Sequence, residues 1–455
     1  MNQESDIFVH IIITKKKMNR RNMYKTEKKS FYDIIVIGGG AGGLMAAVTA
    51  AANGAKTLLL EKNEVLGKKL SLTGGGRCNL TNSASRAELM ENIPINNKFL
   101  YSSLALFDNE SIMNFFIANG VDLKCEDGGR VFPASETSLA VIELFIKKLK
   151  QHGVSVKTKQ TVTEVLPENG GLCCVKTEGE EIYYAAKVII ACGGKSFPNT
   201  GSTGDGYVLL SNLGHKINPL YAAEVPIKCA DIPFDSHELM GLSLSDAALS
   251  VYNGKNRKIV THRGELVFTH FGISGPIALR CSGFVNKVKQ VESAKFVALS
   301  LDLSPDKSKA EILSEWMIWT KQNPEKEIKS LLRNFVPDRF AKVILKISDK
   351  AENSRVKQLN PLDFEKMADY IKDFKLKASG TFPIERAFIT AGGVSTKEIN
   401  PKTMESKLIP GIYICGELLD VSGYTGGYNL TIAFSTGYTA GFSAAGTQTE
   451  RLTDV

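Results

Sequence analysis

The segment Tyr32–Lys62, YDIIVIGGGAGGLMAAVTAAANGAKTLLLEK, constrains the fold more than any other part of the chain. Its apolar run Ile34–Ile37 has the composition of a strand buried on both faces of a parallel sheet. The alanine-rich run Leu44–Ala52 predicts a helix that Asn53-Gly54 ends, and Thr57–Leu60 predicts the next strand. Strand, helix and strand in this order predict an α/β fold with a parallel sheet.

The turn of this unit carries the GxGxxG spacing at Gly38, Gly40 and Gly43, and Glu61 follows 23 residues after Gly38. Glycines let the backbone approach a pyrophosphate, the helix N-terminus offers free N–H groups, and the acid can accept ribose hydroxyls. A glycine-rich turn kept for packing alone is the competing interpretation. Strand, helix and terminal acid occur together, which favours a dinucleotide site without deciding between FAD and NAD.

A second glycine-rich stretch, KNEVLGKKLSLTGGGRCN, runs from Lys62 to Asn79 and carries Lys68, Lys69 and Arg77. Such a loop suits a cofactor whose ribityl and isoalloxazine half is wrapped by backbone, with cations near the diphosphate. An ordinary surface loop is the alternative. Three successive glycines argue against it, because they give up backbone entropy without packing in return. The loop therefore favours FAD.

Length and composition set broad limits on the chain. Its 455 residues predict two or three domains, and 43% hydrophobic with 23% charged residues is ordinary for a globular protein. The eight cysteines form no CxxC pair, which predicts reduced thiols in a cytosolic setting, and the histidines form no metal-ligand pattern. No apolar run reaches the roughly 18 to 20 residues that span a bilayer. We expect a soluble, cytoplasmic protein with no metal and no membrane partner.

The first thirty residues are basic, with eight Lys or Arg against three acidic side chains, and they carry much of the net charge of +8. A basic arm that meets nucleic acid is one interpretation. The other, which we favour, is a disordered or mis-started tail with Met18 or Met23 as the true start.

Six motifs extend over the rest of the chain in a fixed order. They are TGGGRCN (73–79), GGRVFPAS (128–135), GGKSFPNTGSTGDGY (193–207), THFGISGP (269–276), TAGGVS (390–395) and GELLDVSGYTGGYN (416–429). With these motifs, the sequence from Phe31 to about Gly446 resembles the BaiN/RdsA-type family of NAD(P)/FAD-dependent oxidoreductases.

The resemblance implies an FAD-binding domain of the two-dinucleotide-fold, glutathione-reductase-like Rossmann type, interrupted by an inserted β-barrel-like domain and a small helical domain. We place the tail at 1–30, the FAD-binding domain at 31–215 and 389–446, the barrel at 216–304 and 373–388, and the helical insert at 305–372. Short strands with turns such as Asn253-Gly254 agree with a barrel. Helical spacing in ILSEWMIW agrees with a helical insert, in which Trp316 and Trp319 are core residues.

The C-terminal segment is expected to complete the cofactor site. The strand Gly411–Asp420 ends near Glu417, our candidate for the ribityl chain, and a helix that begins at Tyr428–Leu430 can point its N–H groups at the flavin. The residues expected to hold FAD are Gly38, Gly40, Ala41, Gly42, Gly43, Glu61, Lys62, Lys69, Gly75, Gly76, Arg77, Asn79, Val162, Cys192, Gly193, Gly194, Gly416, Glu417, Gly427, Tyr428, Asn429 and Leu430.

Three residues are candidates for catalysis and one for substrate binding. Cys78, if exposed beside the flavin, can protonate a carbanion; a buried filler is its alternative. His270 can act as an acid or only brace a turn, and Tyr424 can orient substrate. Arg130 can pair with a substrate phosphate or carboxylate, or form a structural ion pair. No second GxGxxG follows, so NADH or NADPH is expected as a transient reductant.

The resemblance implies three activities: reduction of uridine to dihydrouridine in 23S ribosomal RNA, reduction of an enone in a small apolar substrate, and oxidation of an aminoacetone-type amine. We favour ribosomal RNA, because the helical insert holds 14 basic against 11 acidic side chains, although a solvated helix face gives a similar count. A flavin-binding protein without turnover is a fourth hypothesis. The residue types gathered around the expected ring argue against it.

Overall fold

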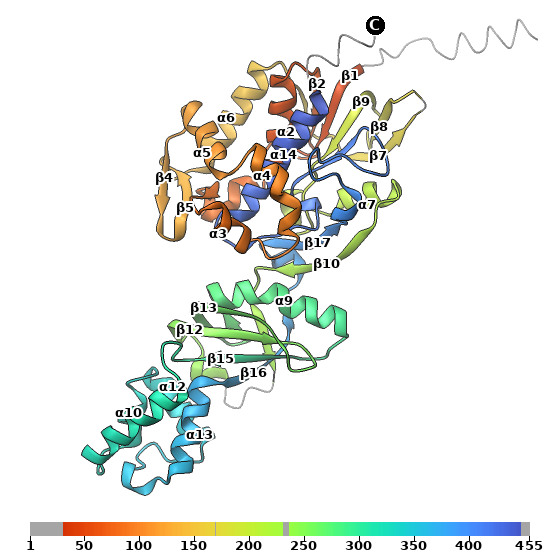
Figure 1. The fold of residues 1–455 in the computed structure, drawn as a ribbon. Helices are drawn as coiled ribbons and strands as arrows, with labels where there is room; N and C mark the ends of the chain where they lie inside the picture. Colours follow the sequence, from red (N-terminus) through yellow and green to blue (C-terminus); the bar gives the residue numbers. More distant parts are fainter. Residues whose placement is uncertain (1–30, 169, 231–235, 447–455) are drawn as a thin grey trace, which may run out of the picture.

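The computed structural model describes residues 31–168, 170–230 and 236–446, so both interpretations of the basic tail lie outside the described residues. Figure 1 shows three parts stacked along the molecule: a sheet-and-helix domain, a barrel and a group of helices. The first part contains both the N-terminal and the C-terminal segments of the described chain.

The large sheet is parallel over most of its width. Its strands β6 (Ser155–Lys157), β2 (Thr57–Leu60), β1 (Phe31–Ile37) and β9 (Ile182–Ile190) lie in this order, and β18 (Ile412–Ile414) pairs with the last residues of β9. The strand β8 (Cys173–Thr177) pairs antiparallel with the first half of β9, and β7 (Val162–Pro167) pairs antiparallel with β8 at the edge of the sheet. Ile37 aligns with both Leu60 and Ile190, so three parallel strands end together. This is a Rossmann-type FAD-binding fold.

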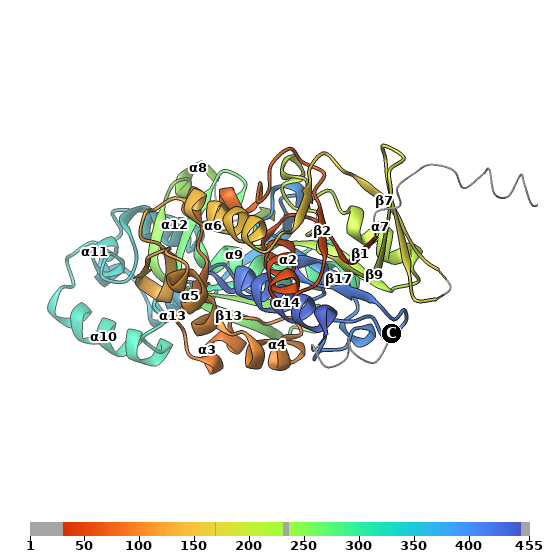
Figure 2. The ribbon, with the colours of Figure 1, turned by 90° about the horizontal axis from the view of Figure 1, so that it is seen from above.

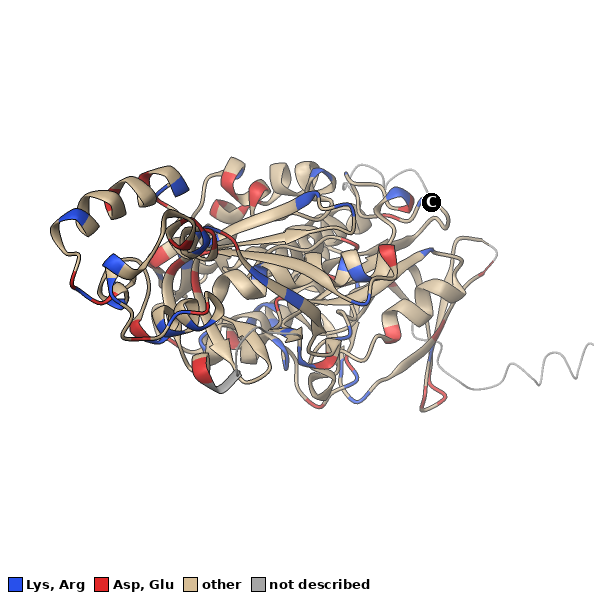
Figure 3. Ribbon diagram, turned by 90° about the horizontal axis from the view of Figure 1, so that it is seen from below, with Lys and Arg blue, Asp and Glu red and all other residues tan. Residues whose placement is uncertain are grey.

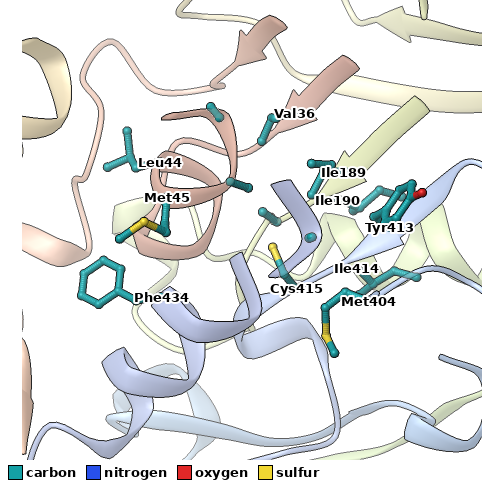
Figure 4. Close-up of a cluster of buried hydrophobic side chains, with 14 of the residues drawn as sticks. Val36, Leu44, Met45, Ile189, Ile190, Met404, Tyr413, Ile414, Cys415 and Phe434 are labelled. Carbon is teal, nitrogen blue, oxygen red and sulfur yellow. The ribbon is translucent and has the colours of Figure 1, made fainter. Parts of the chain in front are cut away.

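Two helices from opposite ends of the chain lie against each other beside this sheet, α2 (Ala41–Ala52) and α14 (Tyr428–Ala445) (Figure 2). A Cβ atom on Gly437 would lie 2.3 Å from the backbone oxygen of Gly42, and one on Gly441 would lie 2.4 Å from that of Ala46. The backbones of the two helices therefore touch, which side chains at these glycines would prevent. Figure 4 shows the buried core that they share with the sheet, including Met45 and Phe434.

The remaining elements of this domain cover the sheet and bring in its connections. The helices are α3 (Arg86–Glu91), α4 (Tyr101–Leu106), α5 (Asn109–Ala118), α6 (Ser138–Gln151) and α7 (Asp205–Asn212), and a small sheet contains β3 (Thr81–Asn82), β4 (Leu123–Glu126) and β5 (Arg130–Pro133). Phe116 and Phe145 pack edge to face at 5.9 Å, and each lies within 6 Å of Phe434 in α14. This aromatic cluster joins the N-terminal helices to the C-terminal helix.

The second part is a closed barrel with the strand order β11, β14, β13, β12, β15, β16. The strands are β11 (Ile227–Ala230), β12 (Ser243–Tyr252), β13 (Lys258–Thr269), β14 (Gly272–Ser274), β15 (Val297–Asp302) and β16 (Phe374–Thr381), with helices α8 (Ser236–Leu239) and α9 (Pro276–Glu292). The segment β10 (Ile217–Ala223), which the sequence assigned to the barrel, instead pairs with β17 (Ile389–Val394). This ladder forms the connection between the first domain and the barrel, so the barrel wall begins later than expected (Figure 1).

The third part is helical and is inserted between β15 and β16. Its helices are α10 (Lys309–Gln322), α11 (Ile328–Leu332), α12 (Asp338–Ile347) and α13 (Pro361–Lys372). Ser308 and Asn360 begin α10 and α13 as capping boxes. Trp316 is 1% exposed in a core that continues into the barrel, and Trp319 packs against that core. Both tryptophans therefore have the structural role that the sequence predicts.

Acidic and basic residues alternate along the ribbon of this helical part (Figure 3). Lys329 contacts Asp338 and Glu352, while Arg355 and Lys357 share Glu325. Several of the basic side chains counted in the sequence are thus paired locally with acids. No helix in the described ranges is both long and apolar enough to cross a membrane.

Candidate cofactor and substrate site

A cavity of about 220 Å³ lies where β1, β2 and β9 end, and the C-terminal helix closes one side of it. The N-terminal segment provides Gly38–Gly42 and Glu61, the middle of the chain provides Cys192 and Gly193, and the C-terminal segment provides Gly416, Glu417 and Asn429 to Ala433. The carboxyl edge of a parallel sheet is the usual ligand-binding edge of this fold class. Segments far apart in the sequence therefore meet in one elongated cavity.

The three motif glycines have three different roles in this cavity. Gly38 turns the chain with φ +104°, and a Cβ there would lie 2.6 Å from the backbone oxygen of Ala191. A Cβ on Gly43 would lie 1.8 Å from the oxygen of Gly38, so only glycine lets α2 begin so close to the strand. At Gly40 a Cβ would meet nothing within 4 Å and would point into open space. Gly38 and Gly43 serve the turn, and Gly40 leaves room for a ligand.

Glu61 is held rigidly at the end of β2 although it is only 7% exposed. The backbone N–H of Gly39 donates to its Oε2 at 2.6 Å. Asn63 donates to Oε1 from its backbone N–H at 2.8 Å and from its side chain at 2.6 Å. The carboxylate is thus fixed against the GxGxxG turn, where a ribose hydroxyl can donate to it.

A second acid, Glu417, also lines the cavity, and its side chain is 21% exposed. Lys69 Nζ contacts Glu417 Oε2 at 2.8 Å and also donates to Ser196 Oγ at 2.8 Å. The backbone N–H groups of Thr390 and Gly194 donate to the same carboxylate at 2.9 and 3.2 Å. Burial raises the pKa of Glu417, but the charge of Lys69 and these hydrogen bonds outweigh it, so the pKa lies below its usual value. Glu417 is therefore an ionised hydrogen-bond acceptor.

The glycine-rich loop before α14 is tightly fixed. The Asn429 side chain donates to the backbone oxygens of Gly423 and Tyr424 at 2.7 and 3.1 Å and accepts from the Gly423 N–H at 2.9 Å. A Cβ on Gly427, where φ is +99°, would lie 2.2 Å from the backbone oxygen of Thr81. The first turn of α14 is thereby held at the cavity, with the positive end of the helix dipole toward it.

The residues present fit FAD. Added side-chain atoms at Gly40 and Gly416 would meet nothing within 4 Å, so the backbone leaves a cradle on both sides of the cavity. Two fixed carboxylates, Glu61 and Glu417, can accept hydroxyl hydrogens, as ribose and ribityl groups require.

The structure brings together most of the residues expected to hold the cofactor. Those that line the cavity are Gly38, Gly40, Ala41, Gly42, Glu61, Lys62, Lys69, Val162, Cys192, Gly193, Gly416, Glu417, Asn429 and Leu430. Those outside the lining are Gly43, Gly75, Gly76, Arg77, Asn79, Gly194, Gly427 and Tyr428. Gly43, Gly194 and Gly427 act through backbone, by close approach or by a hydrogen bond.

Two arginines expected at the cofactor or substrate occupy a network on the protein surface instead. Arg77 Nη1 contacts Glu126 Oε1 at 2.8 Å, and its guanidinium lies 4.1 Å over the ring of Phe132. Arg130 approaches the same glutamate at 3.7 Å. Glu126 therefore binds the charges that the sequence assigned to a phosphate or carboxylate of a ligand. This contact favours the structural ion pair for Arg130, and its role in substrate binding stays a prediction.

Cys78 is not the exposed thiol that the sequence suggested. It is 0% exposed, has φ +64°, and its backbone N–H bonds to the Thr73 oxygen at 2.9 Å. Burial raises the pKa of its thiol to about 12, partly offset by a hydrogen bond with Thr73. The tight turn of the glycine loop points the side chain into the hydrophobic core. The expectation of an exposed proton donor at Cys78 is therefore wrong in this structure.

The other two catalytic candidates also lie outside the large cavity. His270 is exposed at the turn between β13 and β14, with its ring edge-on to Phe271 at 5.0 Å. Tyr424 is 7% exposed, its ring meets His262 of the barrel edge-on at 4.8 Å, and burial raises the pKa of its hydroxyl. Tyr424 lies at the junction of the two domains, whereas His270 packs only against its own turn.

Several cavity residues were not anticipated. Asn63 fixes Glu61, and Thr390 fixes Glu417 while its side chain accepts from the Lys195 and Ser196 N–H groups at 2.8 and 3.1 Å. Asp205 pairs with Lys62 at 2.5 Å. Thr390 and Asp205 belong to the TAGGVS and GSTGDG motifs, so their signal was present. Pairing them with partners far along the chain requires the fold.

All eight cysteines lie in the described part of the chain, and none is in a disulfide. Over the same described residues, no group of three or more His, Cys, Asp or Glu side chains is arranged to hold a metal ion.

The chain is similar to known proteins over most of its length. The family model described as HI0933-like protein Rossmann domain matches residues 32–443. A 3-dehydro-bile acid delta(4,6)-reductase of Clostridium scindens is 32% identical over 391 residues, which cover 86% of this chain and 93% of that protein. A ribosomal RNA dihydrouridine synthase of Escherichia coli is 27% identical over 385 residues, covering 85% and 91%. One of the same name from Haemophilus influenzae is 27% identical over 394 residues, covering 86% and 92%.

Proposed function

The chain belongs to the HI0933-like family, the BaiN/RdsA-type FAD-dependent oxidoreductases, and on this premise we propose that it reduces a C=C bond conjugated to a carbonyl group. The proposed substrate is uridine in 23S ribosomal RNA, which becomes dihydrouridine, and NADH or NADPH is the proposed electron donor. The observation that carries the redox part is the single cavity in which Glu61 and the Lys69–Glu417 pair are both fixed beside open glycine positions.

FAD bound in such a cavity supplies hydride transfer to and from carbon. The chain's own residues bind and orient it: Glu61 accepts from ribose hydroxyls, and Glu417, kept ionised by Lys69, accepts from the ribityl chain. The N-terminal turn of α14 points its free N–H groups at the cavity, where they favour negative charge. The buried ends of β1, β2 and β9 exclude water from their part of the cavity wall.

The choice of ribosomal RNA is supported by two relatives that carry that name and by the net charge of +8. A small-molecule enone reductase is the second candidate, favoured by the 32% identity to the bile-acid reductase. Uracil and a steroid enone both present an alkene conjugated to a carbonyl, so the same site suits either one. The two substrates differ in the part of the molecule that is attached to the reducible bond.

The test is the dihydrouridine content of 23S ribosomal RNA, measured by nuclease digestion and mass spectrometry in cells with and without the gene. We expect the modification to disappear with the gene, to return with the intact gene, and to stay absent with a Gly40→Ala variant that cannot take up the cofactor. Unchanged dihydrouridine would contradict the RNA proposal. Turnover of a 3-oxo-Δ4 steroid by the purified protein would then favour the second candidate.

Anaerobic mixing with NADH and with NADPH distinguishes an FAD-dependent enzyme from a protein that binds flavin without turnover. We expect bleaching of the flavin absorbance by at least one nicotinamide, because the site is built for hydride transfer. A flavin that neither nicotinamide bleaches would argue against this choice of electron donor.

A further inference from the structure

A second, much smaller cavity lies where α9 of the barrel meets the loop before α14. Its polar lining is Tyr221, Glu224, Arg280, Lys287, Ser422 and Tyr424. The two cavities adjoin along this loop, because Val421 lines the large one and Ser422 to Tyr424 line the small one. The small cavity is therefore next to the proposed FAD site, between two domains.

Arg280 brings an uncompensated positive charge to this cavity. Its guanidinium lies 5.3 Å over the ring of Tyr424, and within the described residues no carboxylate lies within the 4.0 Å of an ion pair. Arg263, on the same barrel, is instead paired with Asp246 and Asp306 at 2.6 and 2.7 Å. The ring orients Arg280 without consuming its N–H donors, which leaves them free for an oxygen.

Glu224 adds a carboxyl group that is buried although it has no cationic partner among the described residues. It is 2% exposed, it takes the left-handed conformation with φ +56°, and the Thr425 N–H donates to its Oε2 at 3.1 Å. No Lys or Arg of the described chain lies within ion-pair distance of it. Burial raises the pKa of Glu224 to about 7, although hydrogen bonds from Thr425 and the charge of Arg280 lower it in part.

Apart from Asp420, whose negative charge acts on Tyr221, the other titratable groups around the cavity are neutral or positive at neutral pH. Burial and the charge of Arg280 lower the pKa of His262 to about 4, so its imidazole is neutral. Burial raises the pKa values of Tyr221 and Tyr424, so both hydroxyls keep their protons. Lys287, two turns after Arg280 on α9, adds a second positive side chain at the mouth. The site as a whole favours an electron-rich oxygen.

The size of the cavity limits what part of a substrate it receives. Its volume is about 20 Å³, room for one group the size of a water molecule. A carbonyl or carboxylate oxygen fits this space and a ring does not. The remainder of a substrate therefore has to lie outside this cavity, at its opening.

We propose that this cavity is the oxygen-binding site of the substrate, in which Arg280 binds the oxygen conjugated to the reducible C=C bond and Glu224 supplies the proton. This rests on the proposed function and specifies its substrate class: an alkene conjugated to a carbonyl or carboxylate. Both residues lie on the insert side of the domain junction, at a place that the sequence motifs do not mark.

The chemical step balances with these two groups. The β-carbon of the alkene accepts a hydride from the reduced cofactor, the C=C electron pair moves to the oxygen, and the resulting enolate is paired with Arg280. The α-carbon then takes the proton of the Glu224 carboxyl, which leaves a saturated carbonyl compound and a carboxylate. The carboxylate regains its proton from solvent, and the cofactor regains its hydride from a nicotinamide.

The test is the binding of pentafluorophenol to the oxidised holoenzyme, followed by calorimetry and by the change in the flavin spectrum. This acidic phenol is ionised at neutral pH and imitates an enolate oxygen. We expect Arg280→Gln to weaken binding about tenfold or more, the loss of one charged hydrogen bond. Arg280→Lys should restore part of it. The matched control is Arg257→Gln, which removes the same charge from an exposed turn of the barrel.

The role of Glu224 is read from pH dependence. Because its ionised form repels the phenolate, wild-type affinity should fall as pH rises through about 7, and Glu224→Gln should remove this fall without abolishing binding. Arg280→Gln that binds as tightly as wild type, or wild type that binds no phenolate, would overturn the proposal. The assay uses no RNA, so a failed dihydrouridine test leaves its result standing, and the reverse also holds.

Discussion

Lys69 and Glu417, 348 residues apart in the sequence, are joined by an ion pair of 2.8 Å that connects the two segments of the flavin domain. The pair lies beside the GxGxxG turn at one cavity wall, and the backbone of Thr390 and Gly194 supports it. The cofactor site is therefore complete only when the C-terminal segment has returned to the N-terminal one.

Lys69→Met should destabilise the protein and weaken flavin retention, because it leaves the carboxylate of Glu417 buried without its cation. Because the two side chains are 24% and 21% exposed, the cost of breaking the pair is about 1 to 3 kcal/mol. Thermal melting and the ratio of flavin to protein absorbance measure the two effects. Adding Glu417→Gln to Lys69→Met should recover part of the melting temperature. A double variant no more stable than Lys69→Met would mean that the charge of Glu417 is not the cause.

Gly43→Ala and Gly40→Ala should fail in different ways. A methyl at Gly43 would lie 1.8 Å from the Gly38 oxygen, so the turn must open, and we expect a clear loss of melting temperature and of flavin. A methyl at Gly40 meets no protein atom within 4 Å, so the fold should survive while the cofactor is excluded. Circular dichroism and flavin content together check this. Full flavin content in Gly40→Ala would show that this position does not face the cofactor.

Cys78 should resist thiol reagents in the native protein, because it is fully buried and its thiol pKa is raised to about 12. Cys125 is exposed and should react first. Titration with a chromogenic disulfide, before and after denaturation, separates the two thiols, and Cys125→Ser should remove the fast phase. Rapid native labelling of Cys78, located by peptide mass spectrometry, would contradict its burial.

Glu224→Gln should stabilise the protein at alkaline pH and change little at acidic pH. The pKa of Glu224 is raised in the folded state to about 7, so folding disfavours its ionised form. The stability of wild type is fully present below the unfolded pKa of about 4.3 and falls as pH rises toward about 7, by about 3 kcal/mol in total. Urea unfolding at pH 5 and pH 8 measures the difference. Equal effects of the substitution at both values would show that no titration is involved.

The elements around the GxGxxG motif could be predicted because their signals are local. The strand Thr57–Leu60 was expected with these bounds, and α14 begins at Tyr428 as anticipated. Periodicity and glycine spacing act over a few residues, so they do not depend on distant partners. The segment Ile217–Ala223 reads as a strand in the same way, but its partner β17 is about 170 residues later, and no local signal identifies it.

In the candidate site, too, local sequence signals identified some residues, while the partners of their side chains depend on distant segments. Arg77 and Cys78 belong to a motif that indicated function, yet Glu126 and the hydrophobic core, supplied by later segments, determine what their side chains contact. Arg280 and Glu224 gave no signal, because an arginine on a helix and a glutamate in a loop are ordinary until α9 and the loop before α14 meet.

The sequence by itself determined the Rossmann-type fold, the family, and the backbone positions that only glycine can occupy, because these depend on short-range geometry. The tertiary structure decided which side chains have partners, which are buried, and which are left unpaired at a cavity. A charge is either neutralised or available according to the groups within a few ångströms of it, and chain folding alone brings those groups together.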